Sequence, residues 1–300
     1  MPFNPFVERR ARTTVKVTRP DNAGKQTEHN YTFEQHRQRI SLRQGGKQYG
    51  NAKVEIFGVP LSSMNQIARL WMETLTPQND DTLSIDVWDG KDFVPLFQGV
   101  ITWSAVDASG MPQVKLVIEA NASMVLMNTT ASPYASGTGP VALPDALTNI
   151  LKPQGFSLDY SDTATRYQLT DVHVTGSPLE QVSTLLRHYD ELTWFCNLQR
   201  LIVRRAKAPF NEDAIRIAAD TGMQGFPVYS SSGLQFSTIF NARLRPGAPL
   251  DVQVTDFDFI NRTKWVAAVV AHQLDVNLPG GQWTTGIAAN SFGAKGNGQE

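Results

Sequence analysis

The chain has 300 residues, of which 41% are hydrophobic and 18% charged, a balance that suits two or three compact domains and excludes an intrinsically disordered chain. The 27 lysines and arginines are offset by 28 aspartates and glutamates, so no overall charge indicates nucleic-acid binding. One cysteine excludes an internal disulfide, and no apolar run approaches the roughly 20 residues of a membrane-spanning helix. The Met-Pro-Phe-Asn-Pro-Phe start lacks the apolar core of a signal peptide. We therefore expect a soluble protein made in a cytoplasm.

The first fifty residues differ from this average because they are basic. They hold ten lysines and arginines against four acidic residues, which predicts a basic N-terminal arm. Such an arm can bind a polyanion or an acidic protein surface, and an ordinary solvated face is the simpler interpretation.

Residues 1–130 have the pattern of a β-rich domain with one helix. Apolar and polar residues alternate over 14–18, 52–56, 83–87 and 114–118, with an apolar stretch over 93–105. We expect these strands to form a closed or nearly closed sheet, a first β-barrel-like tube domain, because closure removes exposed strand edges. A helix is predicted with its cap at one of two serines, an apolar stripe at helical spacing and an end at a proline (Ser62 or Ser63; Met64, Ile67, Trp71 and Leu75; Pro77).

A change of composition marks a linker over residues 128–140, and a small α+β domain is expected over 139–208. Its first helix runs over about 144–151 and stops at Pro153-Gln154-Gly155. Its second helix begins with a capping box in which Ser177 and Glu180 cap each other and Pro178 takes the first helical position. Residues 192–195 and 201–203 then predict a hairpin that turns at about 197–200.

The remainder of the chain returns to strands. Alternation over 234–240, 250–254, 265–270 and 273–276, with a turn at Pro279-Gly280-Gly281, predicts a second β-barrel-like tube domain over 209–290. The glycine-rich residues 291–300 are expected to be a flexible tail. The fold class is therefore α+β and mostly β, with two tube domains and the small domain between them.

Catalytic motifs are absent or weak in this sequence. It has no Gly-x-Ser-x-Gly elbow, and the glycines of Ser136-Gly137-Thr138-Gly139-Pro140 lack the Lys-Ser/Thr of a phosphate loop. The five histidines show no i, i+4 pair, and Cys196 has no second cysteine at zinc spacing. A calcium loop is disfavoured at Asp86, Asp89 and Asp92, where a charged hairpin tip is the simpler interpretation.

Two clusters of titratable residues have alternative explanations. His188, Asp190 and Glu191 could include an acid–base pair, but a histidine at a helix C-terminus is already explained by the helix dipole. Asp256 and Asp258 could share one strand face at a glycosidase-like spacing, without any other sign of a sugar cleft. We therefore assign no catalytic, cofactor-binding or metal-ligating residue, and we expect no cofactor and no enzymatic activity.

A succession of short motifs resembles phage tail baseplate hub proteins of the Mu-like type. Residues 51–61 followed by the Met64 helix, and residues 83–100 with Phe97-Gln98-Gly99, are similar to the first module of that family, and the capped helix with residues 201–203 is similar to its insert. The C-terminal module is matched by a longer series: Gly225-Phe226-Pro227, Gly233-Leu234, Phe240-Asn241, Leu244-Arg245-Pro246-Gly247, Trp265-Val266, His272-Gln273-Leu274 and residues 278–285.

The resemblance implies a homotrimer whose two tube domains per chain form a pseudo-sixfold ring between the tail tube and the central spike. The implied partners are the tail tube or distal tail protein, the central spike or tail-tip protein and the tape measure protein, in a virion assembled in the bacterial host cytoplasm. No membrane and no sequence-specific nucleic acid is implied. We expect strand edges at 114–118 and 250–254 to make the contacts between copies.

Two alternatives remain open. The chain could be the hub part of a type VI secretion spike, which the end at residue 300 without a β-helical needle disfavours. The small α+β domain could instead be a cell-wall-binding module, if aromatic residues such as Tyr160, Tyr167 and Trp194 line an exposed groove.

Overall fold

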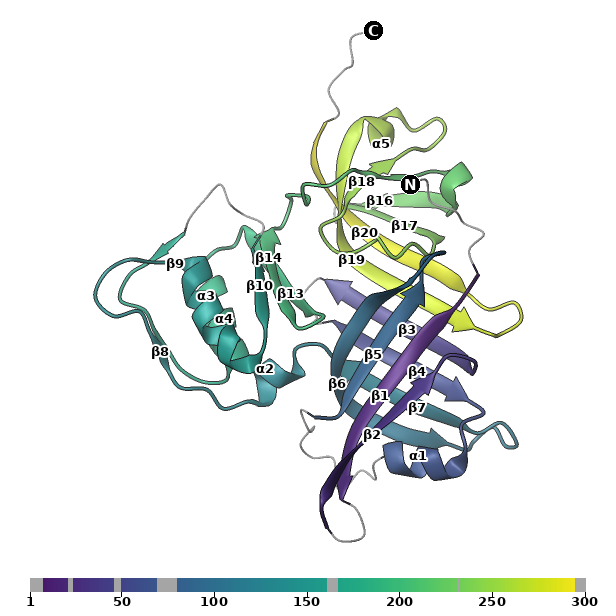
Figure 1. The fold of residues 1–300 in the computed structure, drawn as a ribbon. Coiled ribbons are helices and arrows are strands. Elements are labelled where there is room, and N and C mark those ends of the chain that lie inside the picture. Colours follow the sequence, from purple (N-terminus) through teal and green to yellow (C-terminus); the bar gives the residue numbers. More distant parts are fainter. Residues whose placement is uncertain are drawn as a thin grey trace.

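The computed structural model describes residues 8–20, 24–45, 50–68, 80–160, 167–230 and 233–294 of the 300-residue chain. Three parts follow one another in Figure 1: a first half (β1–β7), an insert (α2–β14) and a second half (β15–β20). The first half comprises β1 (Ala11–Pro20), β2 (Gln26–Phe33), β3 (Arg37–Gly45), β4 (Asn51–Phe57), α1 (Leu61–Ile67), β5 (Thr82–Trp88), β6 (Phe93–Asp107) and β7 (Lys115–Asn121).

The insert and the second half complete the chain. The insert comprises α2 (Met124–Asn128), β8 (Tyr134–Ala135), β9 (Val141–Ala142), α3 (Leu143–Leu151), η2 (Lys152–Gln154), β10 (Ser157–Tyr160), β11 (Gln168–Leu169), β12 (His173–Val174), α4 (Pro178–Leu186), β13 (Leu192–Asn197) and β14 (Arg200–Arg205). The second half comprises β15 (Ile215–Ile217), η3 (Ala219–Thr221), β16 (Met223–Ser230), β17 (Gly233–Ile239), β18 (Pro249–Val252), α5 (Asp258–Arg262), β19 (Thr263–Val276) and β20 (Trp283–Ala294).

The start of α4 confirms the predicted capping box. The hydroxyl of Ser177 accepts a hydrogen bond from the Glu180 amide, the Glu180 carboxylate accepts one from the Ser177 amide, and Pro178 takes the first helical position. The predicted hairpin is also confirmed: Leu198 and Gln199 turn between β13 and β14 with φ values of 50° and 55°. Two consecutive positive φ values are typical of the tight turns that match the twist of a hairpin.

The prediction for α1 is only partly correct. Met64 and Ile67 are buried as expected, but the helix begins after Pro60 and no serine side chain caps it. Ala68 is extended and its amide bonds to the Met64 carbonyl, so the helix ends at Ile67. The predicted continuation through Trp71 and Leu75 to Pro77 lies outside the described residues.

One sheet runs through both halves, and it is not closed. Its 13 described strands follow the order β16-β17-β20-β19-β3-β4-β7-β6-β5-β1-β2, with β15 and β18 attached beside β19. The expectation of closed tube domains is therefore not met among the described strands. Closure of the first half would require β3 to pair with β2, but β3 pairs with β19 over eight residue positions instead. The two halves are thus joined by backbone hydrogen bonds, edge to edge.

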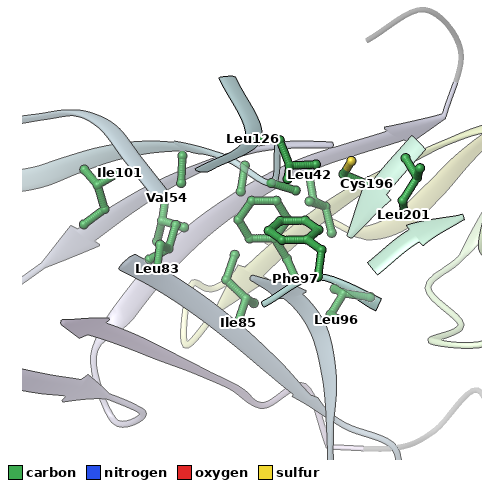
Figure 2. Packing of buried hydrophobic residues seen from close by; sticks show 14 of the residues in the cluster. Leu42, Val54, Leu83, Ile85, Leu96, Phe97, Ile101, Leu126, Cys196 and Leu201 are labelled. Atoms are coloured by element: carbon green, nitrogen blue, oxygen red, sulfur yellow. The ribbon is translucent and has the colours of Figure 1, made fainter. Parts of the chain in front are cut away.

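Two hydrophobic cores lie behind this sheet. The larger core combines the first half with the insert, and the smaller one belongs to the second half and contains the fully buried Trp265. Figure 2 shows Phe97 of β6 in the larger core, with Cys196 and Leu201 of the insert hairpin nearby. The buried amide of Asn197 donates to the carbonyl of Leu96 at 3.0 Å. The insert is therefore packed on the first half by both apolar and polar contacts.

The strands of the second half run further than the sequence indicated, and a short helix interrupts them. β19 is one continuous strand across the two segments predicted for 265–276, and β20 continues to Ala294, past the predicted boundary at residue 290. Residues 295–300 lie outside the described part of the chain. The helix α5 was not predicted. No helix of the described residues is long and apolar enough to cross a membrane.

Candidate functional site

The candidate site is a polar face of the sheet on the side opposite both cores. In β3, Ile40 and Leu42 are buried while Arg39 and Arg43 are exposed. The neighbouring strands β4, β7, β20 and β17 show the same alternation of buried and accessible positions. Each half therefore buries one face of its strands and leaves the other accessible.

A β-bulge keeps the two halves in phase where they meet. The register between β19 and β20 shifts between Ala267 and Val269, which leaves Ala268 as the extra residue. Because one extra residue moves the alternation by one, Trp265 before the bulge and Leu274 after it both lie on the core side. The accessible face therefore continues from one half into the other without a reversal.

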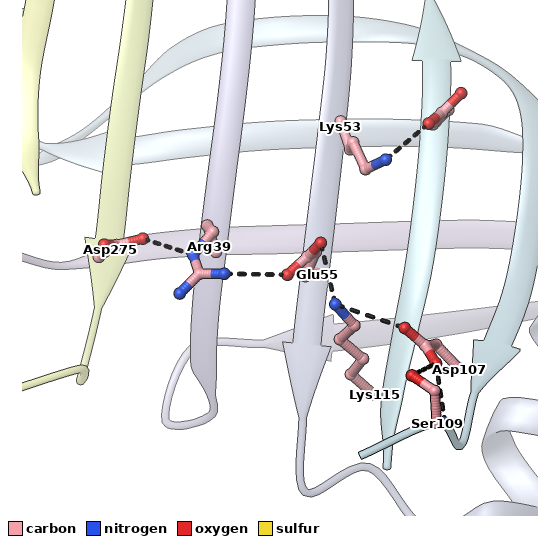
Figure 3. A network of polar contacts seen from close by, with 8 residues as sticks. Arg39, Lys53, Glu55, Asp107, Ser109, Lys115 and Asp275 are labelled. Atoms are coloured by element: carbon pink, nitrogen blue, oxygen red, sulfur yellow. Dashed lines mark hydrogen bonds and ion pairs between the residues drawn. The ribbon is translucent and has the colours of Figure 1, made fainter. Parts of the chain in front are cut away.

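Charged side chains form a chain of ion pairs across this face (Figure 3). Arg39 of β3 bonds to Asp275 of β19 at 3.3 Å and to Glu55 of β4 at 3.4 Å. Glu55 also accepts from Lys115 of β7 at 3.2 Å, and Lys115 lies 3.5 Å from Asp107 of β6. Exposed pairs of this kind contribute at most about 1 kcal/mol each. Their main effect is to place a carboxylate beside each cation of the network.

Further polar pairs extend the network. Lys53 and Glu119 lie 3.0 Å apart on neighbouring strands, and Ser41 donates to Gln273 at 2.6 Å across the joint between the halves. Hydrogen bonds from the Ser109 hydroxyl and amide, with Lys115, hold the pKa of Asp107 below its usual value. The sequence showed these residues as the polar positions of alternating strands, but their partners depend on the register between strands.

The second half presents an exposed apolar rim at the edge of the sheet. We define the rim as five side chains on β16 and beside α5 that are 51–73% exposed: Phe226, Val228, Tyr229, Phe257 and Phe259. The Tyr229 and Phe259 rings are 5.2 Å apart, and Phe226 and Phe257 are 6.4 Å apart. Tyr229 also lies 6.3 Å from the buried Trp265, so the rim continues the smaller core outwards. Clustered exposed aromatic side chains are typical of surfaces that contact another protein.

Other exposed apolar side chains lie near the far part of β6. Leu61 of α1 is 61% exposed, Trp103 of β6 is 36% exposed, and Met111 in the turn after β6 is 74% exposed. β6 pairs with β5 only as far as Val100, and from Ile101 onwards its described partner is β7 alone. The free edges are therefore at β16, at the far part of β6 and at β2.

The strand edges expected from the sequence are inside the sheet. Residues 114–118 fall on β7, which lies between β4 and β6, and residues 250–254 include β18, which pairs with β15 and β19. Alternation in the sequence identifies a strand but does not show whether that strand has one neighbour or two, and this is why the expectation was wrong.

The basic N-terminal segment is part of the sheet and not a separate arm. Its residues form β1, β2 and β3, and several of its cations have carboxylate partners there. Arg10 and Arg12 bond to Glu34 at 2.5 and 3.2 Å, and Arg19 bonds to the buried Asp81 at 2.9 Å. The excess of positive charge in the sequence is thus partly neutralised by neighbouring strands.

The aspartates at the β5–β6 turn serve the turn itself. The Asp89 carboxylate accepts the amides of Lys91 and Asp92, both at 2.8 Å, and these bonds hold its pKa below the usual value. Burial instead raises the pKa of Asp86, which lies within β5. Within the described residues no group of three histidine, cysteine or acidic side chains is placed to hold a metal ion.

The structure does not place Asp256 and Asp258 on one strand face. Asp256 has a φ of 66° in the turn before α5, and Asp258 is in the first turn of that helix, 3.1 Å from Arg262. The alternating Asp and Phe residues resemble a strand in sequence, but the left-handed residue ends the extended chain and starts a helix. The glycosidase-like spacing is therefore absent.

The remaining titratable candidates are separated or buried. His188 and Asp190 are exposed after α4, and Glu191 accepts a hydrogen bond from the Tyr167 hydroxyl at 3.0 Å. Cys196 is fully buried, and desolvation raises the pKa of its thiol to about 12, which leaves no reactive thiolate at neutral pH. What the described surface offers is accordingly a polar face and apolar edges.

Solved structures with the same fold come from phage-related systems. A tail protein of Neisseria meningitidis MC58 is 8% identical with a TM-score of 0.59, over 95% of this chain and 96% of its own. The 43 kDa tail protein of prophage MuSo2 from Shewanella oneidensis is 9% identical with a TM-score of 0.58, over 94% and 99%. The c3393 protein of E. coli, a component of the type VI secretion system, is 12% identical with a TM-score of 0.57, over 86% and 74%. At these identities the likeness establishes the fold alone.

Sequence comparison identifies the family. No curated protein sequence matches the chain. The family model described as baseplate hub gp41, however, matches residues 77–275, which include most of the sheet and the whole insert. This match confirms the resemblance inferred from the short motifs. The chain therefore belongs to the baseplate hub gp41 family and is a hub-like structural protein of a phage tail baseplate.

Proposed function

We propose that three copies of this chain form a pseudo-sixfold ring that connects the tail tube to the central spike or tail tip in the virion. The protein acts through its surfaces and not as an enzyme. The polar face of the sheet lines the bore of the ring, and the insert lies on its outside.

The observation that carries this proposal is an internal repeat in the order of the strands. From β16 onwards, the second half contributes β16, β17, β20 and β19, which are the first, second, fourth and third of these strands along the chain. The first half then contributes β3, β4, β7 and β6, again first, second, fourth and third of that set. The repeated arrangement makes each chain equivalent to two units of a ring, and three chains then supply six.

The charge pattern of the polar face supports its place in the bore. The cations of the central network, Arg39, Lys53 and Lys115, each have a carboxylate within 3.4 Å. A passing polyanion must compete with these carboxylates for every contact, which weakens the attraction of phosphate groups to basic side chains. Such a surface allows DNA to pass without being held.

Negative-stain images of the purified protein, alone and with its tail-tube and spike partners, test the proposal. The expected result is a ring with a central hole and threefold or pseudo-sixfold symmetry, with a mass of three chains by light scattering. A chain that stays monomeric both alone and with these partners would refute the ring and favour a binding module.

A hydrolase assay tests the non-enzymatic part of the proposal. Cell-wall hydrolysis by the purified protein that is lost in His188→Ala or Asp258→Asn, and kept in the exposed control variant Arg262→Gln, would refute it. We expect no activity that depends on these side chains.

A further inference from the structure

The joint between the two halves of one chain shows how two copies can meet. At this joint β19, the third strand of its set, pairs with β3, the first strand of the next set. At the two ends of the eight-strand series, β6 is again a third strand and β16 again a first strand. Neither has the corresponding neighbour among the described residues.

We propose that β16 of one copy pairs with residues 102–107 of β6 in the next copy, and that this contact repeats the β19–β3 joint. The proposal rests on the proposed ring and names the surface that builds it. All seven pairings between the eight strands are antiparallel. An even number of alternating strands leaves β6 and β16 antiparallel when two copies are placed side by side, so the sheet continues without a change of type.

The internal joint also supplies a register. β6 has a bulge between Ile101 and Trp103, as β19 has one between Ala267 and Val269. Val269, the residue after that bulge, lies opposite Gly45, the last residue of β3. Placing Trp103 opposite the last residue of β16 in the same way aligns the two joints.

This register makes specific residue pairs. Within the chain, Ala271 lies opposite Arg43, two positions into the joint. The corresponding positions between copies are Ala105 of β6 and Val228 of β16. Both lie on the polar face, because Ala105 pairs with Val117 in line with Glu119, and Val228 pairs with the exposed Gln235. Directly opposite residues of this kind have Cβ atoms about 4.5–5.5 Å apart.

The apolar side chains are placed to support the same contact. On the core side of β16, Tyr229 falls opposite Ser104, whose hydroxyl bonds to the carbonyl of Ile67 at the end of α1. The apolar rim of one copy therefore faces the helix that carries the exposed Leu61 in the next copy. Pro227 and the bulge in β16 shorten the run of strand pairing, so the rim supplies much of the contact.

The other free edge, β2, fits β16 less well. From β16 to β2 the path has eleven strands, an odd number, so these two would run parallel when copies meet. The exposed residues of β2 are polar (Gln26, Glu28, Asn30 and Thr32), and Glu28 is paired with Lys16 at 2.6 Å. A charged, polar edge resists the addition of another strand.

Cysteine pairing in the full-length protein tests the contact. Ala105→Cys and Val228→Cys are made singly and together, and the samples are oxidised or treated with a short bismaleimide. Mixing the two single variants should give a covalent dimer on a non-reducing gel, and the double variant should give a closed covalent trimer. Each single variant alone, and the wild-type chain with its buried Cys196, should remain uncross-linked.

A matched control places the cysteine on the other edge. Gln26→Cys mixed with Val228→Cys should give no product. If light scattering shows the trimer but Ala105→Cys with Val228→Cys gives no cross-link, the proposed contact is wrong while the ring stands. If Gln26→Cys cross-links instead, the contact is made by β2. If every sample is monomeric with its tail partners present, the ring and the contact both fail.

Discussion

The two halves of the sheet share an order of strands but differ in how they end. The first half folds β5, β1 and β2 over its own core, and its outer edge at β2 carries polar and paired charged side chains. The second half has only β15, β18 and α5 as cover, and its edge strand β16 contains no charged residue. Its core continues outwards into the apolar rim.

This difference indicates that one half is complete by itself and the other is completed by a neighbour. A charged edge protects a sheet from adding strands, whereas an apolar edge gains free energy when another surface covers it. In an assembly, such an asymmetric chain has one complementary direction of contact and forms a closed ring if the rotation permits. The following predictions test this asymmetry.

The largest effect is expected from one residue type in two settings. Phe97 in the shared core is 1% exposed, and Phe97→Ala should lower the free energy of unfolding by about 3–5 kcal/mol. Phe226 in the apolar rim is 73% exposed, and Phe226→Ala should change monomer stability by no more than about 0.5 kcal/mol. Urea titrations at low protein concentration measure both. Equal losses would show that the rim belongs to the core of the monomer.

The next effect concerns the bond between the insert and the second half. The buried Arg204 guanidinium donates to the carbonyls of Arg205, Ala206 and Ala208, and at 3.2 Å to Ala267 of β19. Desolvation lowers the pKa of Arg204 to about 10, so it stays charged at neutral pH. Arg204→Met should cost about 1.5–3 kcal/mol, the range for hydrogen bonds to charged groups.

The exposed Arg200 on the same strand supplies the control for Arg204. Arg200→Met should be near neutral in the same urea titration. A gain in stability for Arg204→Met would mean that the cost of burying the cation exceeds the value of its four bonds.

A smaller effect is expected at the joint between the halves. Gly45 has a φ of 82°, and a Cβ there would collide with the carbonyl of Ala268 and with Pro246. Gly45→Ala should therefore cost about 1–3 kcal/mol and speed hydrogen exchange in β3 and β19. Gly280 has a φ of 68° with open space around it, so Gly280→Ala reports the backbone strain alone. Equal effects of the two changes would show that the joint can give way to the added methyl group.

The smallest effect is a pH dependence located in the first half. Hydrogen bonds from Arg10, and then Arg12, hold the pKa of Glu34 below its usual value. Because the folded pKa is the lower one, the stabilisation is present at neutral pH and is lost as the pH falls through the folded pKa. Glu34→Gln should reduce the change in urea midpoint between about pH 6 and pH 3. An unchanged acid dependence would show that other carboxylates dominate.

Much of the local structure follows from the sequence alone. Ser177, Pro178 and Glu180 determine the start of α4 because a capping box needs only residues three apart. Strand alternation correctly located most of the sheet, because one face of each strand is buried. Where a local pattern was ambiguous it misled: Asp256 and Asp258 alternate with phenylalanines like a strand, yet a left-handed turn and a helix lie there.

The tertiary structure alone decided which strands are neighbours. Residues 114–118 read as an edge but lie between two strands, and β3 pairs with β19, more than 200 residues away, instead of closing a barrel. Arg39 was visible in the sequence as one basic residue among ten, and only the register brings it to Glu55 and Asp275. Hydrogen-bonding groups of the backbone are the same in every strand, so the choice of partner depends on how the buried faces pack together, which no short stretch of sequence contains.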